Sequence, residues 1–439
     1  MSARRGRTLL VLGGSHDQLF LIRTARALGV RTLVVDGNPA APGLREGTLG
    51  EPVSFGDLPA LFACVDRNLA AGEPLAGVLT MGSDVPHVMA AVAARYGWVG
   101  PSIETGAVAT DKLAMKERFA AQGVPVPRFA RVDDAGEALE RWREWGCERV
   151  VVKPTDRAGS RGVSLVEDRS FLAPAHAHAR RCGRSGVVLL EEHLPGPQIS
   201  TETLVHGGRA ETPGLADRLY EGMEIFHPQI MENGGWIPSR VAGTPLEARV
   251  KSLVEAAAGA LGVSAGIAKG DVVVHPDRGP VMIEMAARLS GGDFSEALVP
   301  LGTGVNYVRE AVRVALGEAP DWDALRPRCR RVVANRYFFL PPGRLEQITG
   351  LEPCRDLPGV ATLEIFYRAG DEVPPIRSHG ERVGRMVVAG GSRAAVQAVV
   401  DTIYEGVAFR VGGRWTTARP ADAVPPGTLA HPVPVVPGA

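Results

Sequence analysis

The sequence predicts a mixed protein that begins with an α/β module around a parallel sheet and continues into α+β modules. Residues 8–97 alternate apolar segments of strand length with amphipathic segments of helical periodicity. These segments read TLLVLGG, DQLFLIRTARALG, VRTLVVDGN, AGVLTMGSD and VPHVMAAVAARYG. Repeated β–α units of this kind form parallel sheets with helices on their faces. Farther along, two apolar runs join through HPDRGP, a turn that favours an antiparallel hairpin.

The composition is that of an ordinary globular protein. The 439 residues suffice for roughly two to four domains. The 49 lysines and arginines balance 49 aspartates and glutamates, which argues against nucleic acid or an anionic membrane surface as a partner. No apolar run is long enough to span a membrane, and the one near the start is too short for a signal peptide. Five scattered cysteines without a CxxC pair favour a reduced, cytoplasmic compartment.

Changes in pattern divide the chain into four predicted parts. The parallel-sheet module, which is Rossmann-like, covers residues 1–111. The helix DKLAMKERFAAQG, which ends before VPVP, opens a second part with two lobes over residues 112–318. An α+β module over residues 319–415 contains RRVVANRYFFLPPG and RVGRMVVAGGS. Residues 416–439 form a Pro-rich tail that we expect to be poorly ordered.

The stretch VVVKPTDRAGSRGVSLV, residues 150–166, places a lysine at the end of an apolar strand and a glycine-bearing loop after it. There the ammonium of Lys153 could meet a phosphate, and glycine lets backbone N–H groups approach phosphate oxygens. The stretch matches neither GxxxxGK[ST] nor GxGxxG. A mobile hairpin whose lysine extends its charged head into solvent is the alternative.

A second segment, LLEEHLPG, places two acidic residues where an apolar strand ends. A nucleotide needs an apolar slot for its base and polar groups for its ribose hydroxyls. Glu191, Glu192 and Leu194 could supply both. An ordinary solvated pair of glutamates is the alternative.

The third segment is the predicted hairpin GDVVVHPDRGPVMIEMAAR. Asp271 and Glu284 lie on its two arms, and paired carboxylate oxygens are ligands that suit Mg²⁺. A carboxylate inside the apolar run VMIEMAA is costly unless a cation pairs with it. Arg288, four residues after Glu284, could stabilise charge that develops in a reaction. A salt bridge between Glu284 and Arg288 is the structural alternative.

In this order the segments resemble the ATP-grasp superfamily over about residues 8–411. The resemblance rests on ATDKLAMKERFAAQGVPVP, VVVKP with its glycine loop, LLEEHLPG, GDVVV and IEMAAR. It implies a two-lobed ATP-grasp domain after the Rossmann-like one. Residues 329–411 are similar to the C-terminal module of biotin carboxylase and related ligases. The pattern E-x-A-x-R is similar to that of the amino-acid (dipeptide) ligase branch.

The resemblance also implies roles for the matching residues on the ATP side. Lys112 and Lys153 would contact the phosphates, and the loop from Asp156 to Gly162 would cover the triphosphate. The remaining residues implied to bind ATP are Gly159, Ser160 and Gly162 of that loop, Glu191, Glu192 and Leu194 near the adenine, and Gln198, where the family has a ribose-binding glutamate.

On the metal side, the resemblance implies that Asp271 and Glu284 hold Mg²⁺ or Mn²⁺. Ala286 stands where the family has a metal-binding asparagine, so we expect phosphate oxygens to complete the shell. Arg288 would stabilise an acyl phosphate or a tetrahedral intermediate, with Lys153 as a second catalytic residue.

The activity that the resemblance implies is that of an ATP-dependent carboxylate–amine ligase. Such an enzyme forms an amide or a dipeptide through an acyl phosphate, takes a small-molecule carboxylate and a small-molecule amine, and serves amino-acid or specialised-metabolite biosynthesis. A homodimer is an expectation from the family alone. A bicarbonate-activating carboxylase and a catalytically silent ATP-binding regulator are the alternatives.

Two further segments carry candidate polar residues. Between Gly214 and Val241 we single out Glu224, His227 and Arg240 on the substrate side, with an ordinary surface strand and loop as the alternative. We interpret His16 and Asp17, after the first strand, as a helix cap, with a catalytic role as the alternative.

Overall fold

The computed structural model describes residues 6–422 and divides into two compact units. The first unit contains residues 6–126, Gly196–Ala216 and Ile237–Arg330. The second unit contains Pro127–Pro195, Asp217–Trp236 and residues 331–422. Each unit combines helices with strands, which confirms the mixed α/β and α+β fold class. Residues 423–439 of the predicted tail lie outside the described residues, and the predicted boundaries between domains stay predictions.

The first unit opens with the predicted parallel sheet, in the order β3-β2-β1-β4. Its strands are β1 (Thr8–Leu12), β2 (Arg31–Val35), β3 (Leu49–Glu51) and β4 (Leu75–Leu79). Its helices are α1 (Leu19–Ala27), α2 (Pro42–Glu46), α3 (Leu58–Ala70) and α4 (Pro86–Tyr96). The sequence pattern did not predict β3, because three residues are too few for a visible alternation. Gly50 is required there, since a Cβ would lie 2.0 Å from the carbonyl oxygen of Leu44.

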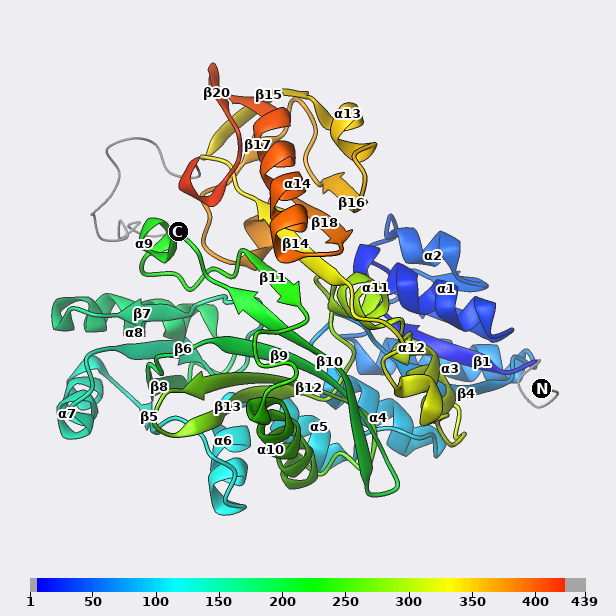
Figure 1. The fold of residues 1–439 in the computed structure, drawn as a ribbon. Helices are drawn as coiled ribbons and strands as arrows, with labels where there is room; N and C mark the ends of the chain where they lie inside the picture. The colour runs from blue at the N-terminus through cyan, green and yellow to red at the C-terminus, as the bar shows by residue number, and fades with distance from the viewer. Residues whose placement is uncertain (1–5, 423–439) are drawn as a thin grey trace. The chain divides into compact units, whose positions relative to one another are not determined.

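An antiparallel sheet in the first unit carries the predicted hairpin. Strands β12 (Ala265–His275) and β13 (Gly279–Ala286) pair across a short turn, and β12 also pairs with β9 (Gln198–His206). The strand β10 (Arg209–Leu219) follows β9, and its last three residues belong to the second unit. The remaining helices are α5 (Ile103–Thr110), α6 (Lys112–Ala121), α10 (Pro245–Leu261), α11 (Val299–Thr303) and α12 (Tyr307–Ala315). Helices α6 and α10 pack on β13, whereas α12 contacts β4, β9 and β12 (Figure 1).

The second unit begins with a small sheet in the order β5-β8-β6-β7. Its elements are β5 (Phe129–Val132), α7 (Ala135–Trp145), β6 (Val150–Pro154), β7 (Ser164–Val166), α8 (Leu172–Cys182) and β8 (Val188–Glu192). Helices α7 and α8 cover this sheet around Trp142, which is 2% exposed. The glycine loop connects β6 to β7, as the sequence predicted.

The rest of the second unit forms a larger module with a core of its own. It contains α9 (Met223–Phe226), β11 (Gly234–Ile237), β14 (Val332–Phe338), β15 (Gly343–Thr349), α13 (Leu351–Arg355), β16 (Val360–Ile365), β17 (Glu372–Val373), β18 (Gly384–Gly390), α14 (Arg393–Gly406), β19 (Ala408–Val411) and β20 (Arg414–Thr416). Strands β14, β18 and β16 are adjacent, and α14 packs across β14 and β18 (Figure 1). Phe338 and Phe409, both fully buried, anchor this core.

The segment from Gly214 to Val241 combines buried and exposed parts. Much of it lies in the buried strands β10 and β11. Its three singled-out residues, Glu224, His227 and Arg240, are exposed. The helix-cap interpretation of His16 and Asp17 is wrong: Ser15 holds the N-cap position of the first turn without a side-chain cap bond, and both residues lie inside that turn.

Within residues 6–422, no helix is both long enough and apolar enough to cross a membrane.

Phe119 on α6 is fully buried in the core of the first unit. We expect Phe119→Ala to lower the free energy of unfolding by about 3–5 kcal/mol, because it removes a large apolar side chain and leaves a cavity. The measurement is the midpoint of urea unfolding. Ile103→Ala is the matched control, since Ile103 is 56% exposed. Equal midpoints for the two variants would contradict this placement of Phe119.

Candidate active site

The hairpin of the first unit brings the two predicted metal ligands together. Asp271 on β12 lies directly opposite Glu284 on β13, so both side chains belong to one face of the pair. Asp271 is buried and accepts a hydrogen bond from Lys269. Glu284, whose side chain is 38% exposed, pairs with Lys112 at 3.6 Å. The donor set therefore fits a hard divalent cation such as Mg²⁺, which prefers carboxylate oxygens.

Arg288 lies where the segment after β13 meets the parallel sheet. Its Nε atom donates to Asp84 Oδ1 at 2.7 Å, and one Nη donates to the carbonyl of Leu289 at 3.0 Å. The backbone N–H of Gly82 donates to the same carbonyl, at 3.0 Å. Asp84 follows β4, so the carboxyl edge of the parallel sheet fixes the direction of the guanidinium.

Burial and charge act in opposite directions on this ion pair. Burial of the Asp84 carboxyl would raise its pKa, but the positive charge and hydrogen bond of Arg288 outweigh burial and hold the pKa below its usual range. Burial likewise disfavours the charged form of Arg288, yet Asp84, Glu202 and Glu284 together raise the pKa of its guanidinium. Both groups are therefore charged at neutral pH.

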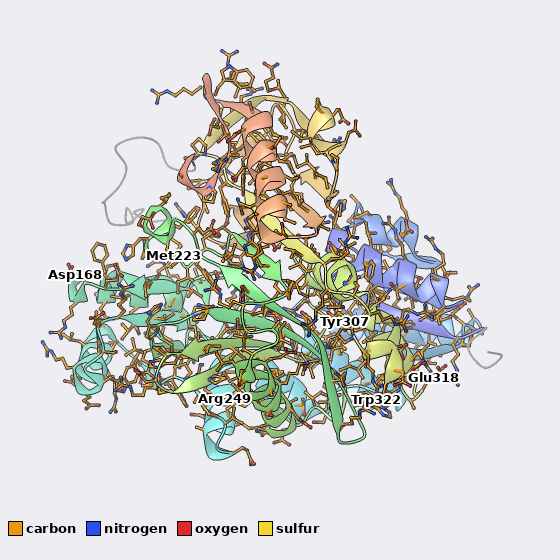
Figure 2. The ribbon with its side chains drawn as sticks, in the orientation of Figure 1. Asp168, Met223, Arg249, Tyr307, Glu318 and Trp322 are labelled. Carbon is orange, nitrogen blue, oxygen red and sulfur yellow. The ribbon has the colours of Figure 1, made fainter. Side chains whose placement is uncertain are left out.

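The carboxyl group of Glu202 is fully buried and interacts electrostatically with Arg288. It accepts hydrogen bonds from the hydroxyl of Ser290 and, at 2.6 Å, from that of Tyr307. Tyr307 begins α12, where Figure 2 labels it. Glu202 also lies opposite Lys269 in the β9–β12 ladder. Burial raises the pKa of Glu202 to about 7, although both hydroxyls and the charges of Lys269 and Arg288 act in the opposite direction.

In the second unit, the two glutamates of LLEEHLPG face opposite sides of β8. Glu191 pairs with Lys153 of the neighbouring strand β6 at 2.8 Å, and both side chains are buried. Glu192 instead pairs with Arg128 at 2.7 Å. Successive residues of a strand alternate between faces, so only one of the two carboxylates shares a face with Lys153. Leu194, just after the strand, is 6% exposed.

The glycine loop has a tightly turned backbone between two anchored ends. Gly159, Ser160 and Gly162 all have positive φ, with Ser160 at 59°. A Cβ on Gly162 would lie 2.6 Å from the Cβ of Cys182, so only glycine fits there. Burial would raise the pKa of Asp156, but hydrogen bonds from the backbone N–H groups of Arg184 and Ser185 outweigh burial and lower it.

Three more predicted residues lie at the ends of elements in the first unit. Lys112 is the first residue of α6, after the N-cap Asp111. Gln198 is the first residue of β9, opposite Val273. Ala286 is the last residue of β13 and lies opposite Lys269. The first unit thus brings together Lys112, Asp271 and Glu284, and the second brings together Lys153 and Glu191.

Comparison with known proteins assigns two parts of the chain to described domain families. A family model described as the ATP-grasp domain matches residues 109–292. Residues 109–292 therefore form an ATP-grasp domain. A second model, described as the L-amino acid ligase C-terminal domain 2, matches residues 336–412.

Two relatives and one solved structure are similar to most of the chain. It is 22% identical over 302 residues to the L-arginine-specific L-amino acid ligase of Bacillus subtilis, covering 66% of this chain and 69% of that one. It is 26% identical over 363 residues to the uncharacterized protein y4rH of Sinorhizobium fredii, covering 81% and 72%. The crystal structure of an L-amino acid ligase from Bacillus licheniformis superposes with a TM-score of 0.76 at 20% identity, covering 92% and 98%, which shows a shared fold.

The two domain matches confirm the resemblance seen in the sequence. ATP-grasp ligases of this kind join a carboxylate to an amine and use ATP with Mg²⁺, so the predicted enzyme class and cofactors are confirmed at that level. The roles of individual residues stay proposals, and they rest on the geometry above.

Sequence reasoning missed the carboxylates that surround Arg288. Asp84 had a usable signal, because it follows the apolar run AGVLTMGS at the carboxyl end of a parallel strand, where ligands bind in open α/β sheets. Glu202 interrupts the strand ISTETLV, as Glu284 interrupts VMIEMAA, and the same argument applies to it. Tyr307 gave no such signal, since a tyrosine at a helix start is ordinary.

We expect Glu202 to make stability depend on pH. Its pKa is raised from 4.5 to about 7, so the folded state binds this proton more tightly than the unfolded state does. The stabilisation is complete below pH 4.5 and is lost as the pH rises through about 7, with a total of about 3 kcal/mol. Glu202→Gln cannot titrate and removes this dependence.

The measurement is urea unfolding of the wild type and of Glu202→Gln at pH 5 and pH 8. Relative to the variant, the wild type should be less stable at pH 8 than at pH 5. A stability difference between the two proteins that is the same at both pH values would show that Glu202 ionises normally.

Proposed function

We propose that the chain joins the carboxylate of one amino acid to the amine of a second substrate, with conversion of ATP to ADP and phosphate. The observation that carries this proposal is the match to the L-amino acid ligase C-terminal domain 2 behind an ATP-grasp domain in the same chain. ATP-grasp ligases act on many acids, and the second match favours amino acids among them. The L-arginine-specific relative supports the same substrate class.

The proposed reaction has two steps. A carboxylate oxygen attacks the γ-phosphorus of ATP, the bond to the β-phosphate oxygen breaks, and ADP leaves. The amine nitrogen then attacks the acyl carbon, and the bond between that carbon and the bridging oxygen breaks. Phosphate leaves with the bridging oxygen, and the nitrogen loses a proton. Activation is needed because a free carboxylate is a poor electrophile, whereas phosphate is a good leaving group.

Residues of the first unit would stabilise the charge in these steps. Asp271 and Glu284 would hold Mg²⁺, which offsets charge on the phosphates when it is bound. Arg288 would face the oxyanion, and its pairing with Asp84 fixes the guanidinium before the substrate arrives. A donor that is oriented in advance avoids reorganisation as charge develops.

Residues of the second unit would bind ATP. Lys153 would contact a phosphate, and its buried partner Glu191 holds the ammonium in place. The loop containing Gly159, Ser160 and Gly162 would cover the triphosphate with its backbone N–H groups. Leu194 would contact the adenine, with the backbone of residues 191–192 as a further ATP contact. Lys112 and Gln198, which belong to the first unit, also stay predicted ATP contacts.

Other parts of the proposal concern the substrate side of the site, the location of the enzyme and its partners. Exposed Glu224, His227 and Arg240 stay candidates for the substrate side. A cytoplasmic location, a homodimer and a role in amino-acid or specialised-metabolite biosynthesis also stay predictions. So does the exclusion of nucleic acid as a partner.

The first experiment is a hydroxylamine trap. Hydroxylamine attacks an acyl phosphate and yields a stable hydroxamate. With ATP, Mg²⁺ and a pool of L-amino acids, we expect one or a few hydroxamates in the mass spectrum, together with release of phosphate. The mass would identify the acid directly.

Each other outcome of the trap favours a different function. Phosphate release that requires bicarbonate, without any amino-acid hydroxamate, would favour the bicarbonate-activating alternative. Retained ATP binding without phosphate release from any acid would favour the silent regulator and overturn the ligase proposal.

We expect Glu284→Gln to lower hydroxamate formation at least about 100-fold at 1 mM Mg²⁺, because an amide binds Mg²⁺ far more weakly than a carboxylate does. Raising the Mg²⁺ concentration should restore part of the activity. The matched control is Asp277→Asn, which changes an exposed carboxylate in the turn of the same hairpin. Similar Mg²⁺ titrations for the wild type and Glu284→Gln would remove Glu284 from the metal site.

A further inference from the structure

A histidine from the C-terminal part of the second unit contacts the glycine loop. The Nε2 atom of His379 lies 3.1 Å from the hydroxyl oxygen of Ser160. The backbone N–H of His379 donates to the carbonyl of Gly159 at 3.0 Å. A Cβ built on Gly159 would lie 3.9 Å from the Cβ of His379. Backbone and side chain of one residue therefore both touch the middle of the loop.

The segment that carries His379 is itself rigidly held. Ser378 and Glu381 form a capping box around a short 3₁₀ helix (His379–Glu381). The backbone N–H of Ser378 donates to Glu381 at 2.6 Å. Glu232 gives further support, since its backbone N–H donates to His379 Nε2 at 3.4 Å. Because Nε2 accepts that bond, the hydroxyl of Ser160 is the donor in the contact with the loop.

A buried ionic cluster lies under this segment. Glu232 pairs with Arg218 at 2.7 Å and with Arg382 at 3.6 Å. Arg382 also lies over the ring of Tyr337, 3.7 Å from its centroid. Burial alone would raise the pKa of Glu232, but the positive charges of Arg218 and Arg382 outweigh burial and lower it to about 2. The cluster therefore stays charged near neutral pH. It fixes the position of Glu232, whose backbone contacts His379.

The loop needs such a partner at this position. Ser160 has a φ of 59°, a left-handed conformation that is unfavourable for a residue with a Cβ. The hydrogen bonds of Asp156 to the backbone of residues 184–185 hold one end of the loop. They do not involve residues 159–160. The contacts from His379 stabilise the backbone at the strained residue.

We propose that His379 is a positioning residue that holds the ATP-covering loop in its covering conformation through Ser160 and Gly159. The inference rests on the proposed function, because it takes this loop as the cover of the triphosphate. His379 acts through the loop and need not touch ATP. Its loss should weaken ATP binding and leave binding of the carboxylate unchanged.

The kinetic test compares His379→Ala with two other variants. We expect His379→Ala to raise the KM for ATP about fivefold, the equivalent of one lost hydrogen bond. The KM for the amino acid should stay unchanged. His379→Gln, whose amide can accept from Ser160, should restore most of the ATP affinity. His206→Ala, which changes a partly exposed histidine of the first unit, is the matched control.

A second readout needs no turnover. Arg157 and Arg161 are tryptic sites within the loop, and Arg161 is exposed. We expect trypsin to cut the loop faster in His379→Ala than in the wild type and in His206→Ala. Adenosine 5′-(β,γ-imido)triphosphate with Mg²⁺ should slow the cut in the wild type. Thermal unfolding of each variant checks that it is folded.

The outcomes separate this inference from the proposed function. An unchanged KM for ATP, or an unchanged cleavage rate in folded His379→Ala, would overturn the role of His379. Cleavage that the ATP analogue does not slow in the wild type would overturn the covering role of the loop and the inference with it. Failure of the ligase proposal would appear independently, as a wild type that binds the analogue and forms no hydroxamate.

Discussion

The register of the β12–β13 hairpin is the constraint on which the charged groups of the first unit depend. It places Asp271 opposite Glu284, and β9 places Glu202 opposite Lys269 on the other side of β12. Side chains alternate between faces with a period of two, so a slip of one residue would turn Asp271 to the opposite face. Helices α6 and α10 prevent such a slip, because they bury the apolar residues of β13 against a core that includes Phe119.

Each unit contains a close ion pair among its candidate site residues. Lys153 with Glu191, and Arg288 with Asp84, each bring a cation and a carboxylate together at 2.7–2.8 Å. Removal of two charges from water costs free energy that their attraction only partly offsets. Such pairs are therefore weak sources of stability, and their value lies in holding charged groups at fixed positions. A site for a polyanion with a metal needs that property, since its cations must point the right way before the ligand binds.

The sequence predicted the parts of this fold that local patterns encode. The alternation of β and α segments predicted the parallel sheet, and HPDRGP predicted the hairpin that pairs Asp271 with Glu284. The ordered motifs predicted the ATP-grasp family. The patterns could not predict which charged residues pair with each other. Asp84 and Arg288 are 204 residues apart, and only the docking of the segment after β13 on the carboxyl edge of the parallel sheet brings them together.

The second unit shows the same limit more strongly. Its strands come from chain segments that residues 196–216 and 237–330 interrupt, and no local pattern links these segments. Ser160 and His379 are 219 residues apart, yet they meet at the one non-glycine residue of the loop with a positive φ. A strained serine persists only where its surroundings hold it. The segment that holds it belongs to the region that matches the L-amino acid ligase C-terminal domain 2, so that domain supports the glycine loop as well as packing its own core.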